Sequence, residues 1–136
     1  MPMFPSPLAA AALATVKVAG YAGFARALNR RTGQNVTPMK FGAAKTGLGF
    51  LGGVIYLFWL LPIFGVEDMS DAAAFLGAMP VRLLMWSVAL HLFYDFRGRR
   101  RLIFGAVVLG TLWSYALDGV MWLIYKIVPG MTMPVC

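Results

Sequence analysis

The chain has 136 residues, of which 60% are hydrophobic and 12% are charged, and its formal net charge is +7. Soluble domains carry roughly a quarter of charged residues, and a water-soluble core of this size could not hide so much apolar surface. The composition therefore excludes an ordinary soluble domain and indicates that lipid covers most of the molecule. The basic charges flank apolar segments, so we expect anionic lipid headgroups, and not nucleic acid, as their partners.

Four apolar segments follow one another along the chain. Each is close in length to the stretch of about 20 residues that a helix needs to cross the hydrocarbon layer. Backbone amides in lipid must be satisfied within a helix or a closed barrel, and these segments lack the alternation of barrel strands. The sequence therefore predicts an all-α polytopic membrane protein, one domain over residues 1–136, folded as a four-transmembrane-helix bundle. The spans are expected near residues 7–28, 41–64, 72–96 and 102–128.

The first segment lacks the basic start of a cleavable signal peptide, so we expect it to remain as a helix. The second opens with the glycine-rich sequence FGAAKTGLGFLGG. Helices in lipid associate through close packing, so small residues mark their contact faces. Four glycines are expected either to pack against the first segment or to form a face shared with a partner: Gly42, Gly49, Gly52 and Gly53. Lys45, near the start of this segment, is expected to extend toward the cytoplasmic surface.

The charged residues are divided unequally among the loops. Residues 29–40 and 97–101 are basic, whereas residues 65–71 contain three acidic residues and no Lys or Arg. Basic loops stay on the cytoplasmic side, so both chain ends are expected on the outer side of a bacterial inner (plasma) membrane. Six arginines are expected to contact anionic headgroups: Arg30, Arg31, Arg97, Arg99, Arg100 and Arg101.

The start of the third segment has two interpretations. In one, a single helix begins near Ala72 and contains Pro80. In the other, residues 69–80 form an outer interfacial helix that leads into a shorter span, and Pro80 stands at a helix start, where its missing N–H is harmless. Arg82 lies deep in the membrane in the first interpretation and at its surface in the second.

Three charged residues fall inside the predicted spans: Lys17, Arg82 and Asp118. Each is ten residues inward from the outer end of its span, which is roughly 15 Å at the rise of an α-helix. A charge at mid-bilayer costs about 2.5–3.5 kcal/mol on insertion scales, so it calls for a partner. We expect Lys17 or Arg82 to pair with Asp118, which leaves a surplus positive charge for an anionic group. Alternatively, Lys17 extends to a membrane surface.

A second polar set, His91, Tyr94 and Asp95, is expected on one face of the third helix near its cytoplasmic end. A histidine beside a carboxylate can relay protons or bind a metal, but the chain has a single histidine. The alternative is a polar cap in which Asp95 pairs with Arg97 or Arg99. No metal site is predicted, and the sequence assigns neither a catalytic residue nor a cofactor.

Three classes of function remain. The sequence carries no phosphate-binding loop, nucleophile elbow or haem-binding histidine pair, which favours an accessory or assembly subunit of a larger membrane complex. Its partners would be other membrane subunits or further copies of the chain. The first alternative is a homo-oligomeric transporter or channel for an anionic or lipid-like solute, based on the intramembrane charges. The second is an integral membrane enzyme for a lipid-like substrate, with His91 as acid or base.

Overall fold

The computed structural model describes residues 7–56, 58, 62 and 76–127 of the chain. These residues form four helices and no strands, so the all-α prediction is confirmed for the part of the chain that is described. The helices are α1 (Pro7–Thr32), α2 (Pro38–Ile55), α5 (Met79–Phe93) and α6 (Arg100–Ile127). The acidic residues of the predicted outer loop, Glu67, Asp68 and Asp71, lie outside the described residues.

Two helices are long and apolar enough to cross a membrane, judged by length and composition. They are α1 and the portion of α6 that runs from Arg100 to Ile124. The third apolar helix, α5, has 15 residues, which is short of a full crossing. The description of α2 ends at Ile55, whereas the predicted second span continues to residue 64.

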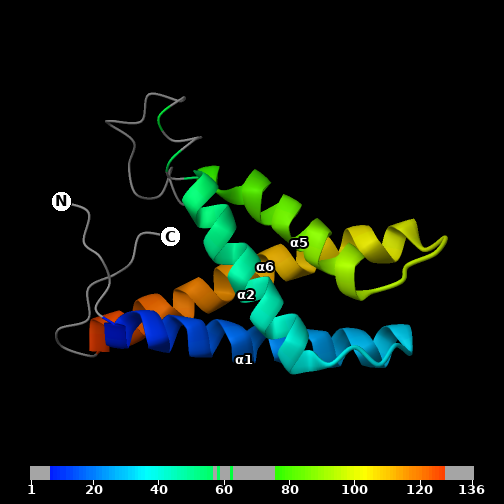
Figure 1. Ribbon diagram of the computed structural model, residues 1–136, viewed down its shortest axis with the longest axis horizontal. Coiled ribbons are helices and arrows are strands. Elements are labelled where there is room, and N and C mark those ends of the chain that lie inside the picture. The colour runs from blue at the N-terminus through cyan, green and yellow to red at the C-terminus, as the bar shows by residue number, and fades with distance from the viewer. Residues whose placement is uncertain (1–6, 57, 59–61, 63–75, 128–136) are drawn as a thin grey trace.

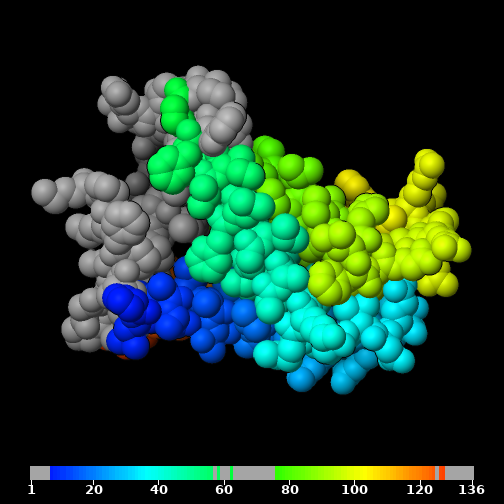
Figure 2. Space-filling view, viewed as in Figure 1, coloured from blue at the N-terminus to red at the C-terminus, as the bar shows by residue number. Residues whose placement is uncertain are grey.

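The four helices form a ring of contacts: α1 packs on α2 and α6, and α5 packs on α2 and α6. Figure 1 shows α1 and α6 running lengthwise in opposite directions, with α2 crossing α1 obliquely and α5 completing the bundle. In the space-filling view, α1, α2 and α5 lie side by side on one face (Figure 2). The start of α1 and the end of α6 lie at one end of the bundle, and the α1–α2 and α5–α6 turns lie at the other (Figure 1).

Glycine and proline set several helix boundaries. Gly33 follows α1 with φ +72°, the left-handed conformation that ends many helices, and its N–H bonds to the Asn29 carbonyl at 2.8 Å. Pro38 opens α2 after the extended Thr37. Pro80 lies in the first turn of α5, where its missing N–H is harmless. The predicted start near Ala72 lies outside the described residues.

The aromatic core is centred on Trp86 of α5, whose side chain is fully buried. The Trp86 ring lies 5.5 Å from that of Tyr21, 4.9 Å from that of Phe24 and 6.1 Å from that of Phe41, measured between centroids. These rings come from α1 and α2, so one indole joins three helices. Large aromatic side chains contribute much of the packing energy of a core, and Trp86 occupies such a position here.

Candidate functional site

Asp118 of α6 pairs with two cations inside the bundle. Its Oδ1 lies 2.9 Å from Lys17 Nζ on α1, and its Oδ2 lies 2.5 Å from Arg82 Nη1 on α5. All three side chains are less than one-sixth exposed. The structure therefore brings together the three residues that the sequence singled out, and Asp118 binds both cations where the sequence left a choice between them.

Arg82 reaches Asp118 from the beginning of its helix. Because α5 starts at Met79, Arg82 lies in its first turn. The guanidinium also lies over the Tyr115 ring, 4.3 Å from its centroid. Ala72, from which the depth of Arg82 was counted, lies outside the described residues.

Lys45 is a fourth charged residue of this cluster, and the prediction that it extends to the surface is wrong. Only 2% of Lys45 is exposed, and its Nζ lies 5.1 Å from the Tyr21 ring centroid and 4.8 Å from that of Trp86. The cause is the packing of α2 on α1. Gly42 touches the α1 backbone at Val18, and Lys45, three residues on, lies on the same face of the helix.

Hydroxyl and indole groups surround the charges. The Tyr21 hydroxyl and Ser114 Oγ share a buried hydrogen bond of 2.7 Å, and Trp113 Nε1 donates to the Gly20 carbonyl at 3.0 Å. Neither Ser114 nor Tyr21 was singled out from the sequence. Ser114 lies four residues before Asp118, and Tyr21 lies four residues after Lys17. This spacing places each on the same helix face as its charged neighbour, and it is the signal that could have identified both.

The cluster carries unequal charge. Lys17, Lys45 and Arg82 supply three positive charges, and Asp118 supplies one negative charge, a surplus of two when all are ionised. In a low-dielectric interior, uncompensated like charges are costly. We therefore regard this cluster, and not the helix ends, as the part of the described chain best able to attract an anionic ligand.

The predicted face of His91, Tyr94 and Asp95 does not form. Helix α5 ends at Phe93, and Tyr94 is extended, with φ −120° and ψ 135°. Tyr94 therefore turns inward and donates to Asn29 Oδ1 at 2.9 Å, while Asp95 turns outward and pairs with Arg97 at 3.1 Å. The alternative, a polar cap with Asp95 bound to Arg97, agrees with this geometry.

His91 is exposed on the last turn of α5. Its Nδ1 lies 2.8 Å from the Ser87 carbonyl, so a neutral ring carries its proton on Nδ1 and leaves Nε2 as an acceptor. A shallow hollow of about 340 Å³ runs from His91 to Arg97. Tyr94 and Asp95 line the same hollow, so the three predicted residues share this surface although they do not share a helix face.

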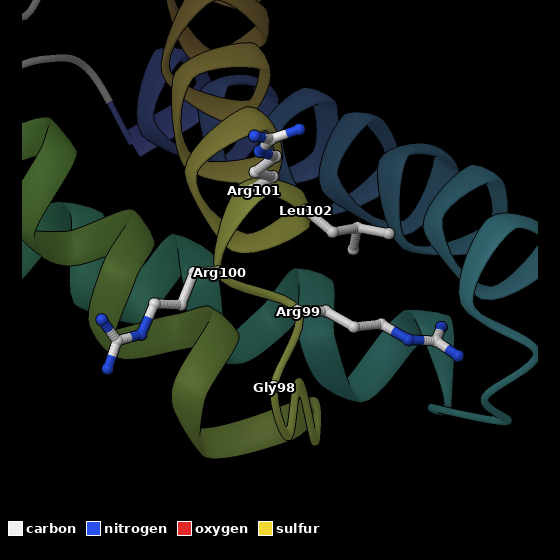
Figure 3. Close-up of a pocket in the computed structure, with 5 residues that line it drawn as sticks. All are labelled: Gly98, Arg99, Arg100, Arg101 and Leu102. Carbon is white, nitrogen blue, oxygen red and sulfur yellow. The ribbon is translucent and has the colours of Figure 1, made fainter.

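The predicted headgroup contacts gather at one end of the bundle. All six are exposed: Arg30, Arg31, Arg97, Arg99, Arg100 and Arg101. A hollow of about 510 Å³ is lined by residues 98–102. Figure 3 shows the side chains of Arg99, Arg100 and Arg101 pointing in different directions, so they do not converge on one bound group. Their arrangement suits separate contacts with several anions.

The four glycines of α2 divide into two pairs. A Cβ on Gly42 would lie 2.5 Å from the Val18 carbonyl oxygen, and one on Gly52 would lie 3.0 Å from Met85, so both occupy helix contacts. A Cβ on Gly49 or Gly53 would meet nothing within 4 Å in the described part of the chain. The G-x-x-x-G pair therefore takes no part in the described contact between α1 and α2.

The described residues contain no group of three or more His, Cys, Asp or Glu side chains that could hold a metal ion. No protein family, curated protein or solved structure matches this chain. The class that the fold defines is therefore a small all-α bundle with two helices able to cross a membrane and a charged cluster at its centre.

Proposed function

We propose that the chain is a small multi-pass protein of the bacterial inner membrane that acts as an accessory or assembly subunit of a larger membrane complex. In this proposal it crosses the bilayer four times, with both ends on the outer side. The observation that carries the membrane location is the apolar outer surface of α1 and α6.

The apolar windows of these two helices are only 28% and 33% buried inside the bundle. Core helices of soluble proteins are mostly buried, and soluble monomers rarely expose large contiguous apolar patches. On α6 the exposed side chains include large apolar groups along its whole length: Phe104, Leu109, Leu112, Trp113, Val120 and Leu123. Lipid or an apolar partner is the surrounding that such a surface favours.

The orientation is supported by the basic end of the bundle. Gln34 Nε2 donates to the Asp95 carbonyl at 2.7 Å, and the Asp95 N–H donates to Gln34 Oε1 at 3.0 Å. These two bonds join the α1–α2 turn to the α5–α6 turn, so both basic turns lie at the same end of the bundle. A single basic end is the pattern expected of loops that remain beside an anionic cytoplasmic leaflet.

The subunit role is supported by Gly49 and Gly53, whose open face on α2 allows another helix to approach closely. The partner would be another membrane subunit or a second copy of the chain. The ion pairs around Asp118 would then serve to stabilise the contacts among α1, α5 and α6.

Topology is tested by thiol labelling in intact cells. Cys136 is the single natural cysteine, and single cysteines are introduced as Gln34→Cys or Arg97→Cys in a Cys136→Ser background. We expect a membrane-impermeant reagent to label Cys136 and to miss both introduced cysteines until the cells are opened. If the reagent labels Cys136 in the wild type and the introduced cysteine in the Gln34→Cys variant from the same side of the membrane, the four-crossing proposal is contradicted.

The subunit role is tested by purification of the tagged chain in a gentle detergent, followed by mass analysis of what accompanies it. We expect stoichiometric membrane proteins with the wild type, and their loss in the Gly49→Leu/Gly53→Leu double variant. Gly23→Leu is the matched control, since Gly23 of α1 also faces open space. A chain that purifies alone and as a monomer, or a double variant that retains every partner, would contradict the proposal.

The second candidate is a homo-oligomeric transporter or channel for an anionic or lipid-like solute. The surplus of positive charge around Asp118 is the observation that favours it. Anion flux into liposomes that contain only this chain, abolished by Lys17→Met, would support the transporter over the subunit.

A further inference from the structure

Two hydrogen-bond donors lie together in the core, the Lys45 ammonium and the indole N–H of Trp86. Lys45 is 2% exposed, and within the described part of the chain its ammonium contacts aromatic rings but no carboxylate or carbonyl. The indole Nε1 of Trp86 is buried and has no hydrogen-bond acceptor among the described residues. Buried donors normally have partners, so this N–H, beside an ammonium that is held against aromatic rings, calls for an explanation.

The two groups lie in the same part of the core. The Lys45 ammonium lies over the Trp86 side chain, 4.8 Å from the ring centroid. Both groups are donors, and the charged groups that act on Lys45 are Lys17, Arg82 and Asp118. Among the described residues, Asp118 is therefore the one carboxylate that acts on Lys45, and it already binds two other cations.

We propose that a small inorganic anion of halide size binds in the core of the bundle, held by the Lys45 ammonium and the Trp86 indole N–H. It compensates the positive charge of Lys45, which forms no ion pair with a described carboxylate. The aromatic rings of Tyr21 and Trp86 enclose the ammonium, which excludes an occupant as large as a lipid headgroup. The site is independent of the accessory role, because an anion bound here stabilises the bundle whatever the bundle assembles with.

The test uses the purified full-length chain in a nonionic detergent. Its melting temperature is measured while chloride or bromide replaces gluconate at constant ionic strength. We expect a saturable rise for the wild type, since a ligand that binds the folded state alone stabilises it. Broadening of the ³⁵Cl resonance, competed by bromide, gives a second measurement that does not depend on unfolding.

Lys45→Met is expected to abolish both the halide-dependent rise and the line broadening. Trp86→Phe keeps an aromatic ring but removes the N–H, and is expected to raise the apparent halide dissociation constant roughly tenfold, as for one hydrogen bond to a charged group. Lys126→Met is the matched control. Lys126 also lies over an indole, 3.7 Å from the Trp122 ring centroid, but it is exposed.

The proposal is overturned if the wild type responds equally to chloride and gluconate and broadens no chloride signal. It is also overturned if Lys45→Met retains the halide response, or if Lys126→Met loses it to the same extent, since surface binding would then explain the effect. Each of these results leaves the topology and the partner proteins untouched, so failure here is distinguishable from failure of the proposed function.

Discussion

Gly110 of α6 lies directly against the indole ring of Trp86 on α5. A Cβ at position 110 would be 2.5 Å from Trp86 Cε3, closer than real Cβ contacts allow. The two helices approach here because position 110 has no side chain. The same indole contacts Tyr21, Phe24 and Lys45, so a displacement of Trp86 would reach α1 and α2 as well.

Gly110→Ala is expected to destabilise the bundle by about 1–3 kcal/mol, the usual range for an overpacked core. The measurement is the melting temperature or the denaturant midpoint in mild detergent. Gly105→Ala on the same helix is the control, because a Cβ there meets nothing within 4 Å. Equal behaviour of the two variants would show that α5 and α6 are farther apart than described.

Gly42→Ala is expected to be more disruptive than Gly110→Ala. Its Cβ would lie 2.5 Å from the Val18 carbonyl oxygen and 3.2 Å from the Ala22 nitrogen, and backbone atoms of a helix cannot rotate away. The contact between α1 and α2 must open, which would expose Lys45. Crosslinking between cysteines placed on α1 and α2 should weaken, and Gly49→Ala should leave it unchanged. A Gly42→Ala variant with wild-type crosslinking and stability would count against this helix contact.

Asp118→Asn is expected to lower stability by about 3–5 kcal/mol, because it leaves two largely buried cations without their carboxylate. Asp95→Asn is the contrasting variant. Asp95 and Arg97 are 62% and 93% exposed, and such surface pairs contribute about 0–1 kcal/mol. Chemical unfolding in detergent measures both. If Asp118→Asn folds with wild-type stability, the paired cluster is not what holds α1, α5 and α6 together.

Tyr94→Phe is expected to cost about 1–2 kcal/mol. The hydroxyl donates to Asn29 Oδ1 at 2.9 Å and approaches the Ala25 carbonyl at 3.2 Å, so its removal leaves acceptors on α1 without their partner. Hydrogen exchange should also become faster in residues 29–36, where Asn29 Nδ2 holds the Val36 carbonyl. Thr15→Val is the control, since that hydroxyl bonds only to Ala11 of its own helix. Equal losses in the two variants would argue against a tie between helices at Tyr94.

Part of this arrangement could be predicted from residue spacing. The position of Asp118 far from both ends of an apolar segment predicts that it needs a cation, and the structure supplies two. Pro80 predicts a helix start by its own geometry, and α5 begins beside it. These features depend on local chemistry, so one segment is enough to infer them.

Features that depend on two helices were not predicted. Lys45 is buried because Gly42 fixes which face of α2 meets α1, and a single segment does not reveal that face. The end of α5 at Phe93 was not predicted, because no glycine or proline directly follows it. The Tyr94 side chain instead forms its hydrogen bonds with residues of α1. Gly49 and Gly53 match a packing pattern, yet the face that meets α1 is set by Gly42.

The hydrogen bonds between the Gln34 amide and the Asp95 backbone join two turns that carry like charges. These neutral groups hold the turns together against the repulsion between their guanidinium groups. Counter-ions from added salt screen the attraction between this end of the bundle and anionic surfaces. They have little effect on the two hydrogen bonds between Gln34 and Asp95, which are formed by neutral groups. Binding of anionic surfaces at the arginine-rich end is therefore expected to weaken as ionic strength rises, while the two turns keep their arrangement.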